Sequence, residues 1–338
     1  MNAHGPFQKH IAGHGNREKR GAEVAAILII NRVLEKAASI PHRTLRALAA
    51  HVGAIWYRLD RKHRDVAMRN LEMAWGKELT EAEKEAICRK VFVNLSTVML
   101  ELPYLLTLTR ENLGRFITFS GVEHLENAQS KGKGVLVLAS HFGNWELMSL
   151  AFSIRHQPIK VVVRPLDNHI LDAIINTLRS RGGNELIPKK GSVRQILRHL
   201  RRNQVVALLA DQNVDWYDGV FVPFFNEIAC TNKAMAVLAL RTGAPVVPVY
   251  NYRQEDGRYA TVFEPEIPII RTADTTGDIE ENAACFNRVI EGFIRRYPEQ
   301  WLWLHMRWKT RPYQLWPRQS LKGQRWLVIR PQIRSLEA

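Results

Sequence analysis

The amino-acid sequence predicts an α/β protein in which a mostly parallel or mixed sheet, flanked by helices, is preceded by an N-terminal helical segment. Three observations support this fold class. Up to about residue 130 the apolar residues recur at helical spacing, whereas from Gly134 onward short apolar runs alternate with amphipathic segments. The run Val135–Ala139 has no polar alternation, as expected for a strand buried on both faces of a mainly parallel sheet.

Composition bounds the class of protein and its partners. The 338 residues are 46% hydrophobic and 24% charged, as in a globular protein with a sizeable core. The formal net charge of +15 predicts an acidic partner, which can be nucleic acid, anionic lipid, a phosphorylated substrate or an acidic carrier protein. The three cysteines lie far apart and form no CxxC motif. We therefore expect neither a disulfide framework nor a zinc site, and a reduced, cytosol-facing location.

The first part of the chain shows no signal-peptide pattern and no uncharged apolar stretch long enough to span a bilayer, so we expect no spanning helix. Residues 1–21 are a basic tail that we expect to be disordered, and residues 22–39 predict a helix. Thr80 and Glu83 form a capping-box pattern that opens a further helix, which stops near Pro103.

Between these helices, apolar residues from Leu45 to Leu59 repeat at intervals of three and four among an excess of arginine and lysine. An apolar stripe beside Arg and Trp is how a helix lies on an anionic membrane surface. The alternative is a helix packed on its own protein with a solvated basic face. Residues 22–130 are therefore predicted to form an N-terminal helical part that associates with a membrane.

Residues 131–315 are predicted to form the α/β core, and residues 316–338 a basic C-terminal extension. Strands are expected where short apolar runs follow turn residues, and helices where the apolar spacing returns to three and four. The predicted strands are 135–139, 159–163, 205–210, 246–250 and 259–263. The predicted helices are 145–155, 169–181, 193–202, 232–242 and 279–296.

His141 follows the first core strand after one serine, and open α/β sheets bind ligands at the carboxyl ends of their strands. Gly143 permits a tight turn, and Asn144 is a good N-cap for the next helix. Glu146 lies in the first turn of that helix, where the dipole favours an ionised carboxylate. A carboxylate beside an imidazole fixes its tautomer and stabilises its charged form, so His141 could accept a proton from an alcohol. The alternative is that Asn144 and Glu146 only cap a helix beside an ordinary loop histidine.

Polar residues also follow two other strands. Arg164 could clamp a phosphate or carboxylate, although a structural salt bridge would explain it equally well. Asp211 lies on the same edge as His141 if the sheet is parallel, whereas a turn-forming aspartate is the ordinary alternative. Residues 219–225 could line an acyl-chain pocket, touch a bilayer or form a buried strand, and Thr231 is expected to cap the following helix.

Basic residues concentrate in two regions. Residues 179–202 hold eight basic residues and one acidic residue, and residues 295–334 hold ten basic residues interleaved with tryptophans. Aromatic side chains among cations are typical of single-stranded nucleic-acid binding and equally of an interfacial belt on a membrane. No RRM, KH or helix-turn-helix signature is present. The sequence also lacks HExxH, GxSxG and GxxxxGK[ST] motifs, and without a serine elbow we expect direct attack by an acceptor hydroxyl.

The stretch from His141 to Glu146, His-Phe-Gly-Asn-Trp-Glu, is similar to the HxxxxE/D signature of glycerolipid-type acyltransferases. Over residues 22–315 the chain resembles, more specifically, the late acyltransferases of lipid A biosynthesis, the lauroyl and myristoyl transferases. Met306 departs from the family pattern, which has a second basic residue there. The other matching stretches, in order, are 163–167, 209–212, 219–225, 230–231, 242–248 and 300–312.

This resemblance implies a membrane-surface enzyme at the cytoplasmic face of the inner membrane, peripheral or monotopic. It implies transfer of a fatty acyl chain from acyl carrier protein to a hydroxyl of a phosphorylated glycolipid, the lipid A precursor. The expected partners are acyl carrier protein, anionic membrane lipid and this acceptor, with no nucleic acid, metal or tightly held cofactor. Two other functions stay open. One is an acyltransferase for another glycolipid, an aminolipid or a lysophospholipid, and the other is a non-catalytic basic protein that binds nucleic acid or lipid.

The resemblance also implies roles for individual residues. His141 is expected to be the general base, and Glu146 to orient it and stabilise its charged form. The candidates for substrate binding, through acceptor groups, the phosphate of the donor or lipid phosphates, are Arg164, Asp211, Asn144, Arg307, Lys309 and Arg311.

Overall fold

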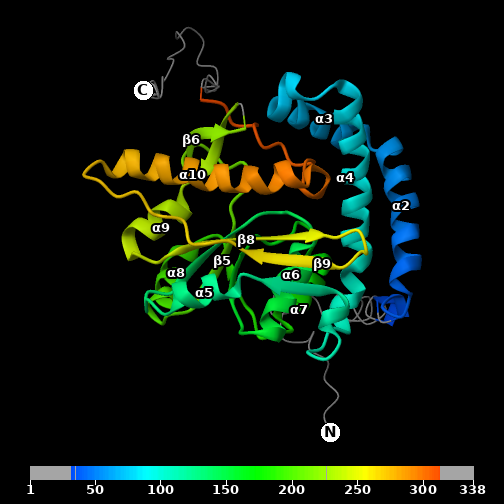
Figure 1. The fold of residues 1–338 in the computed structure, drawn as a ribbon, viewed down its shortest axis with the longest axis horizontal. Coiled ribbons are helices and arrows are strands. Elements are labelled where there is room, and N and C mark those ends of the chain that lie inside the picture. Colours follow the sequence, from blue (N-terminus) through cyan, green and yellow to red (C-terminus); the bar gives the residue numbers. More distant parts are fainter. Residues whose placement is uncertain (1–31, 35, 226, 313–338) are drawn as a thin grey trace, which may run out of the picture.

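The computed structural model describes residues 32–34, 36–225 and 227–312. The predicted basic tail, most of the first predicted helix and the C-terminal extension lie outside the described residues. The main strands are β1 (Ile117–Ser120), β2 (Val135–Ala139), β3 (Lys160–Val163), β4 (Glu185–Pro188), β5 (Val205–Leu209), β8 (Val246–Arg253) and β9 (Tyr259–Phe263). They form one seven-stranded sheet in the order β1-β9-β8-β2-β5-β3-β4 (Figure 1). Neighbouring strands are parallel except for the antiparallel pair β8 and β9, so the sheet is mixed, as predicted.

Helices cover both faces of this sheet. They are α2 (His42–Leu59), α3 (Arg61–Trp75), α4 (Glu81–Glu101), α5 (Val122–Gln129), α6 (Trp145–Arg155), α7 (His169–Ser180), α8 (Ser192–Arg201), α9 (Ala234–Thr242) and α10 (Thr275–Arg296). Val137 and Ala139 of β2 pack with α5 and α6, whereas Leu136 and Leu138 pack on the other face with α8, α9 and α10. Because successive side chains point to opposite faces, a strand covered on both sides is apolar throughout, as predicted for β2.

The N-terminal helices α2, α3 and α4 pack together at one side of the molecule (Figure 1). The predicted helix from Leu45 to Leu59 is α2, and it ends there because Asp60 instead caps α3, accepting from the backbone N–H of His63. The predicted capping box is confirmed at the start of α4. Within the part of the chain that the structure describes, no helix combines the length and the apolar character needed to cross a bilayer.

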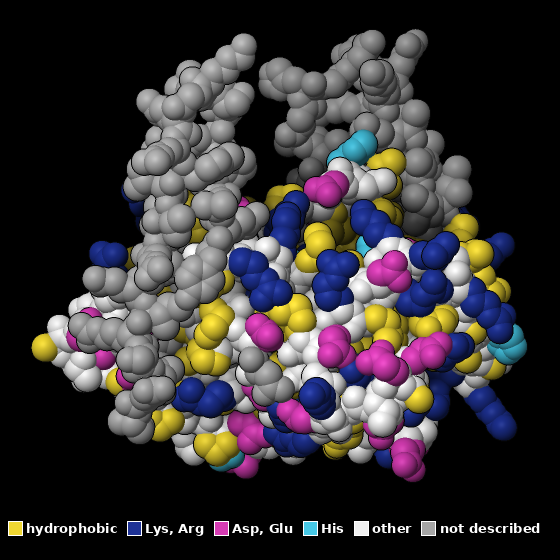
Figure 2. Space-filling view, turned by 90° about the horizontal axis from the view of Figure 1, so that it is seen from above, with side chains coloured by type: hydrophobic (Ala, Val, Ile, Leu, Met, Phe, Trp, Pro, Cys, Tyr) yellow, Lys and Arg dark blue, Asp and Glu magenta, His cyan; other side chains and the backbone are white. Residues whose placement is uncertain are grey.

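Helix α2 has two apolar stripes, one buried and one exposed. Leu45 and Ala49 are buried in the protein, so one stripe packs internally. A second apolar stripe faces outward, with Leu48, Ile55 and Leu59 exposed by 48%, 53% and 77%. On the face seen in Figure 2, the described Lys and Arg side chains lie among Asp and Glu side chains.

Several short elements were not predicted. Strands β1 and β4 have four residues each, and β1 lies within the segment predicted as helical. The stretch 219–225 forms β6 (Gly219–Phe224), paired antiparallel with β7 (Glu227–Asn232). Val222 and Phe224 are buried and the other residues of β6 are half-buried, so the buried-strand alternative holds in part. The expected capping role of Thr231 is wrong, because Thr231 lies within β7 and the Asn232 side chain accepts from the N–H of Ala234.

Candidate active site

The loop after β2 is the centre of the site, and its backbone is fixed on two sides. The N–H of Gly143 donates to the carbonyl oxygen of Gln300 at 2.9 Å. Gly143 has a φ of 58°, and a Cβ there would lie 1.8 Å from the carbonyl oxygen of Asn251. Only glycine fits this turn, which sets the position of His141 at the edge of the sheet.

Asp211, just beyond β5, is the partner of His141. The Nδ1 atom of His141 lies 2.8 Å from Oδ1 of Asp211, and the backbone N–H of His141 donates to Oδ2 at 2.9 Å. The indole N–H of Trp301 also donates to Oδ2, at 2.8 Å. Because β2 and β5 are parallel neighbours, residues 70 positions apart meet at one edge, as predicted. The predicted role of Asp211 in substrate binding is wrong, because its buried carboxylate is bound by His141 and Trp301.

Electrostatics keep this carboxylate charged. Asp211 is only 1% exposed. Burial alone would raise its pKa, but the charge of His141 and the hydrogen bonds from His141 and Trp301 lower the pKa of Asp211 to about 2. An ionised Asp211 accepts the Nδ1–H of the imidazole, so Nε2 of His141 keeps a lone pair that can accept a proton. The side-chain nitrogen of Gln212 lies 3.5 Å from this Nε2 atom. The pair of His141 and Asp211 therefore has the arrangement of an oriented general base.

The predicted pairing of His141 with Glu146 is wrong. Glu146 is bound by Arg179 of α7, whose Nε donates to Oε2 at 2.8 Å and whose Nη2 donates to Oε1. The indole N–H of Trp145 also donates to Glu146, at 3.1 Å. Trp145 in turn lies edge-on to the imidazole of His141, with ring centroids 5.2 Å apart. Glu146 therefore holds Arg179 and Trp145, while Asp211 orients His141.

A cavity of about 470 Å³ opens beside His141. Its volume lies in the range of small-molecule sites. The polar residues of its lining include Glu146, Arg164, Arg179, Lys189, Gln212 and His305. Its apolar walls come from the sheet, α5 and α6, and include Leu125, Val137, Met148, Phe152, Ala207 and Phe263. The cavity is thus an apolar slot along one face of the sheet with a polar end at His141.

Some of the predicted substrate-binding residues are exposed and others are buried. The exposed ones are Arg164, Lys309 and Arg311. Arg164 lines the cavity and is 76% exposed, with only a 3.5 Å contact to Asp167. Lys309 is exposed, and Arg311 lies 3.6 Å from Glu227 at the surface. These three remain candidates for a phosphate contact.

The prediction that Arg307 contacts a lipid phosphate is wrong, because its side chain is completely buried. Its guanidinium donates to the carbonyl oxygen of Cys230 at 2.9 Å and to the hydroxyl of Thr231 at 2.6 Å. It also lies 4.7 Å from the ring centroid of Phe224. Arg307 therefore joins the β6–β7 hairpin to the chain that follows α10.

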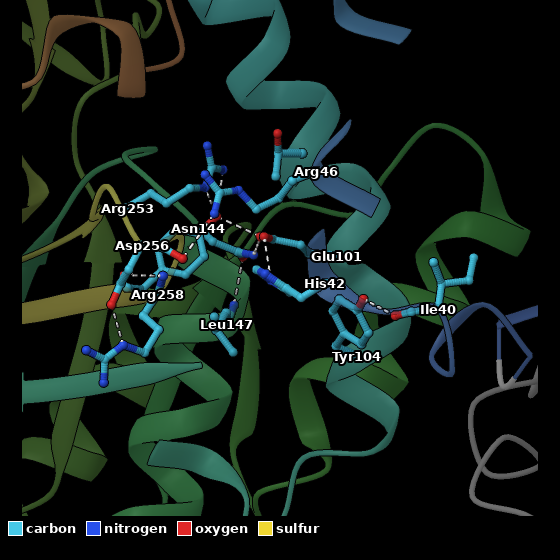
Figure 3. A network of polar contacts seen from close by, with 12 residues as sticks. Ile40, His42, Arg46, Glu101, Tyr104, Asn144, Leu147, Arg253, Asp256 and Arg258 are labelled. Atoms are coloured by element: carbon cyan, nitrogen blue, oxygen red, sulfur yellow. Dashed lines mark hydrogen bonds and ion pairs between the residues drawn. The ribbon is translucent and has the colours of Figure 1, made fainter. Parts of the chain in front are cut away.

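Asn144 is likewise no substrate ligand. It is fully buried and caps α6 as predicted, since its Oδ1 accepts from the N–H of Leu147 at 3.0 Å. Its Nδ2 donates to the buried carboxylate of Glu101 on α4, at 2.9 Å (Figure 3). The hydroxyl of Tyr259 donates to the same oxygen at 2.6 Å, and His42 lies 3.2 Å from the other oxygen. This network connects the N-terminal helices to the loop that carries His141.

The site also contains residues that were not predicted, among them Arg179, Lys189, Gln212, Trp301 and His305. His305 lines the cavity, and its Nε2 accepts from the backbone N–H of Asn213 at 2.9 Å. Burial is the largest cause that lowers the pKa of His305, to about 4, so this second imidazole is neutral. Trp301 and His305 lie in a stretch that matched the family, but no local pattern indicated which of its side chains reach the site.

The fold and the site define an α/β protein with an oriented histidine at the polar end of an apolar slot. Comparison with known sequences assigns the chain to a family. The chain belongs to the bacterial lipid A biosynthesis acyltransferases, whose pattern it matches over residues 15–310. It is accordingly an acyltransferase.

Individual relatives agree with this assignment. The chain is 28% identical over 282 residues to a lipid A biosynthesis lauroyltransferase of Escherichia coli (strain K12), covering 83% of this chain and 90% of that protein. It is 28% identical over 275 residues to a lipid A biosynthesis palmitoleoyltransferase of the same strain, covering 81% and 87%. A phosphatidylinositol mannoside acyltransferase of Mycolicibacterium smegmatis is 26% identical over 200 residues, covering 58% and 64%.

Proposed function

We propose that this protein transfers a fatty acyl chain from the thioester of acyl carrier protein to a hydroxyl of a lipid A precursor. The transfer takes place at the cytoplasmic face of the inner membrane, with the protein bound to the membrane surface. The observation that carries the proposal is the imidazole of His141, held through Nδ1 by Asp211, at the polar end of an apolar slot. A hydroxyl and a long apolar chain are the two groups that such a site brings together.

The reaction needs no covalent enzyme intermediate. Nε2 of His141 takes the proton of the acceptor hydroxyl as its oxygen forms a bond to the thioester carbonyl carbon. The carbon–sulfur bond then breaks, and the thiol of the donor leaves with the proton from His141. Asp211 stabilises the imidazolium that exists between these two steps, because its buried carboxylate lies 2.8 Å from Nδ1.

The walls of the slot support an acyl substrate. Side chains of β2 and β5 and of α5 and α6 line it, and they include Val137, Ala207 and Phe152. Burial of apolar surface contributes roughly 0.8 kcal/mol per CH₂ group, so a fatty chain gains much of its binding energy there. Glu146 keeps Arg179 and Trp145 at the polar end of this slot.

Exposed apolar side chains near the cavity mouth support the membrane location. Leu166 lines the cavity and is 42% exposed. Trp216 and Tyr217 follow closely after the lining residue Val214, and Met306 follows His305, with exposed fractions of 55%, 56% and 46%. Trp and Tyr favour the interface between lipid and water. In the proposed orientation the mouth faces the bilayer, and Arg164, Lys309 and Arg311 contact phosphates of the acceptor or of neighbouring lipids.

A second acceptor has one observation in its favour. The similar mycobacterial protein is named for a phosphatidylinositol mannoside, which is also a glycolipid with a phosphate. The same His141 chemistry would serve that acceptor, because only the hydroxyl enters the bond-forming step.

Purified protein incubated with acyl-loaded carrier protein and a panel of acceptors tests the proposal. Mass spectrometry should show one acyl chain added to the lipid A precursor, and the His141→Ala protein should serve as the inactive control. Transfer to another glycolipid with none to the lipid A precursor would favour the second acceptor. Absence of transfer to every acceptor, from carrier protein or from a small thioester, would refute the proposed reaction.

A further inference from the structure

Helix α8 exposes a row of arginines. Arg194, Arg198 and Arg201 are spaced by four and three residues, so they lie on one side of the helix, and all three are exposed. The opposite side, with Ile196 and Leu200, is buried against the sheet. Among the residues that the structure describes, no carboxylate forms an ion pair with any of the three arginines.

The stability of the helix does not explain this row. Arg198 and Arg201 lie in the last turn, where the dipole favours a positive charge. Arg194 lies in the first turn, where the same dipole disfavours it. Arg194 and Arg198 are also like charges four residues apart, which destabilises a helix by a few tenths of a kcal/mol. The dipole therefore accounts for Arg198 and Arg201 but not for Arg194, whereas an anionic partner would account for the whole row.

The row begins beside the cavity. Strand β4 is parallel to β3, and the N–H of Lys189, the first residue after β4, donates to the carbonyl oxygen of Val163 at 2.7 Å. Lys189 itself lines the cavity. Helix α8 starts three residues later, on the opposite side of the molecule from α2 (Figure 1). A partner on α8 is therefore placed to insert a flexible arm into the cavity.

We propose that the arginine row of α8, Arg194, Arg198 and Arg201, is the docking surface for the acidic carrier protein that delivers the acyl chain. The inference rests on the proposed function, since that function supplies a carrier protein as donor. Charge complementarity selects this partner, because an acidic protein surface matches a row of unpaired guanidinium groups.

The composition of this side of α8 favours a protein over a bilayer. Helices that lie on anionic membranes combine cations with several exposed apolar side chains. Val193 is the only large apolar side chain on α8 that is substantially exposed. The exposed aromatic residues Trp216 and Tyr217 instead lie near the cavity mouth.

The test is the triple variant R194A/R198A/R201A, assayed in detergent micelles with two donors. With acyl-loaded carrier protein, KM for the donor should rise roughly tenfold. This is the loss of affinity expected when three weak surface ion pairs with the carrier are removed together. Raising the salt concentration should increase KM steeply for the wild type and much less for the variant. With an acyl-pantetheine thioester, which lacks the protein, kcat/KM should stay unchanged.

The matched control is K62A/R69A/K77A, which removes three exposed cations from α3 and the turn after it. It changes the net charge equally and should leave KM for the carrier protein unchanged. A direct titration of carrier protein against the wild type and both triple variants should show weaker binding for the α8 variant alone.

Three results would overturn the docking surface: an unchanged KM and titration for the α8 variant, an equal loss with both donors, or an equal effect of the control. Loss of binding to anionic vesicles with carrier binding intact would assign α8 to the membrane instead. If the wild type transferred acyl groups from no thioester, the proposed function would fail, and the titration alone would still decide the docking surface.

Discussion

The Nδ1 atom of His141 and the Oδ1 atom of Asp211 lie 2.8 Å apart at the edge of two adjacent parallel strands. This contact replaces the local His–Glu pair that the sequence motif suggests. The two carboxylates of the site therefore have different partners, because Asp211 orients His141 and Glu146 binds Arg179. The first prediction follows from this difference.

Asp211→Asn should lower kcat by about 10²–10⁴-fold, because an amide neither stabilises the imidazolium nor fixes its tautomer as a carboxylate does. Glu146→Gln should lower kcat less, since Glu146 acts on Arg179 and Trp145. Steady-state kinetics of both variants, with circular dichroism as the check on folding, measure the difference. A larger loss of kcat for Glu146→Gln would reverse the assignment.

Acid should destabilise the protein partly through His305. Its pKa is lowered from 6.5 to about 4 in the folded state, so only the unfolded chain takes up this proton as the pH falls between those values. The stability that a neutral His305 supplies is thus complete above pH 6.5 and is lost on the way down to about pH 4. His305→Gln should weaken this pH dependence, which urea unfolding at pH 7 and pH 4.5 measures. Equal losses in both proteins would show that His305 does not contribute.

The length of the acyl chain should depend on the middle of the slot. Ala207 lies at the centre of β5 and lines the cavity without filling it. Ala207→Leu should therefore shift the preference toward shorter acyl chains, because the added methyl groups occupy the path of the chain. A competition assay with donors of several lengths, read by mass spectrometry, gives the ratio. An unchanged ratio in a folded variant would place the acyl chain elsewhere.

The buried carboxylate of Glu101 should matter more for stability than a half-exposed one on the same helix. Glu101→Ala would leave the Nδ2 of Asn144 (Figure 3) without an acceptor, and likewise the hydroxyl of Tyr259. The cost should be about 2–4 kcal/mol in the free energy of unfolding. Glu85→Ala, which removes a half-exposed carboxylate that pairs with Arg89 and accepts from the hydroxyl of Tyr57, is the control and should lower stability by less. Similar unfolding midpoints for the two variants would contradict the role of the network.

The sequence predicted those features that depend on the residues of a single helix or strand. The apolar run of β2 indicated burial on both faces, and Asn144 and Thr80 marked the starts of α6 and α4. Strands β1 and β4 escaped prediction because each has only four residues and no continuous apolar run like the three valines of β3.

Contacts between distant residues were harder to predict. A parallel sheet brought Asp211 to His141, so that placement followed from the fold class. The pairing of Glu146 with Arg179 depends on how α6 and α7 pack, and no local pattern encodes it. The burial of Arg307 was also hidden, because an arginine among lysines and tryptophans resembles a surface cation until its hydrogen bonds to Cys230 and Thr231 are seen.

The central claim is that His141 removes the proton from the acceptor hydroxyl, and the transfer rate of His141→Ala tests it most directly. With carrier-bound acyl donor and lipid A precursor in excess, the rate should fall by about 10²–10⁴-fold while the circular dichroism spectrum stays unchanged. A correctly folded His141→Ala protein that transfers acyl chains at the rate of the wild type would contradict it.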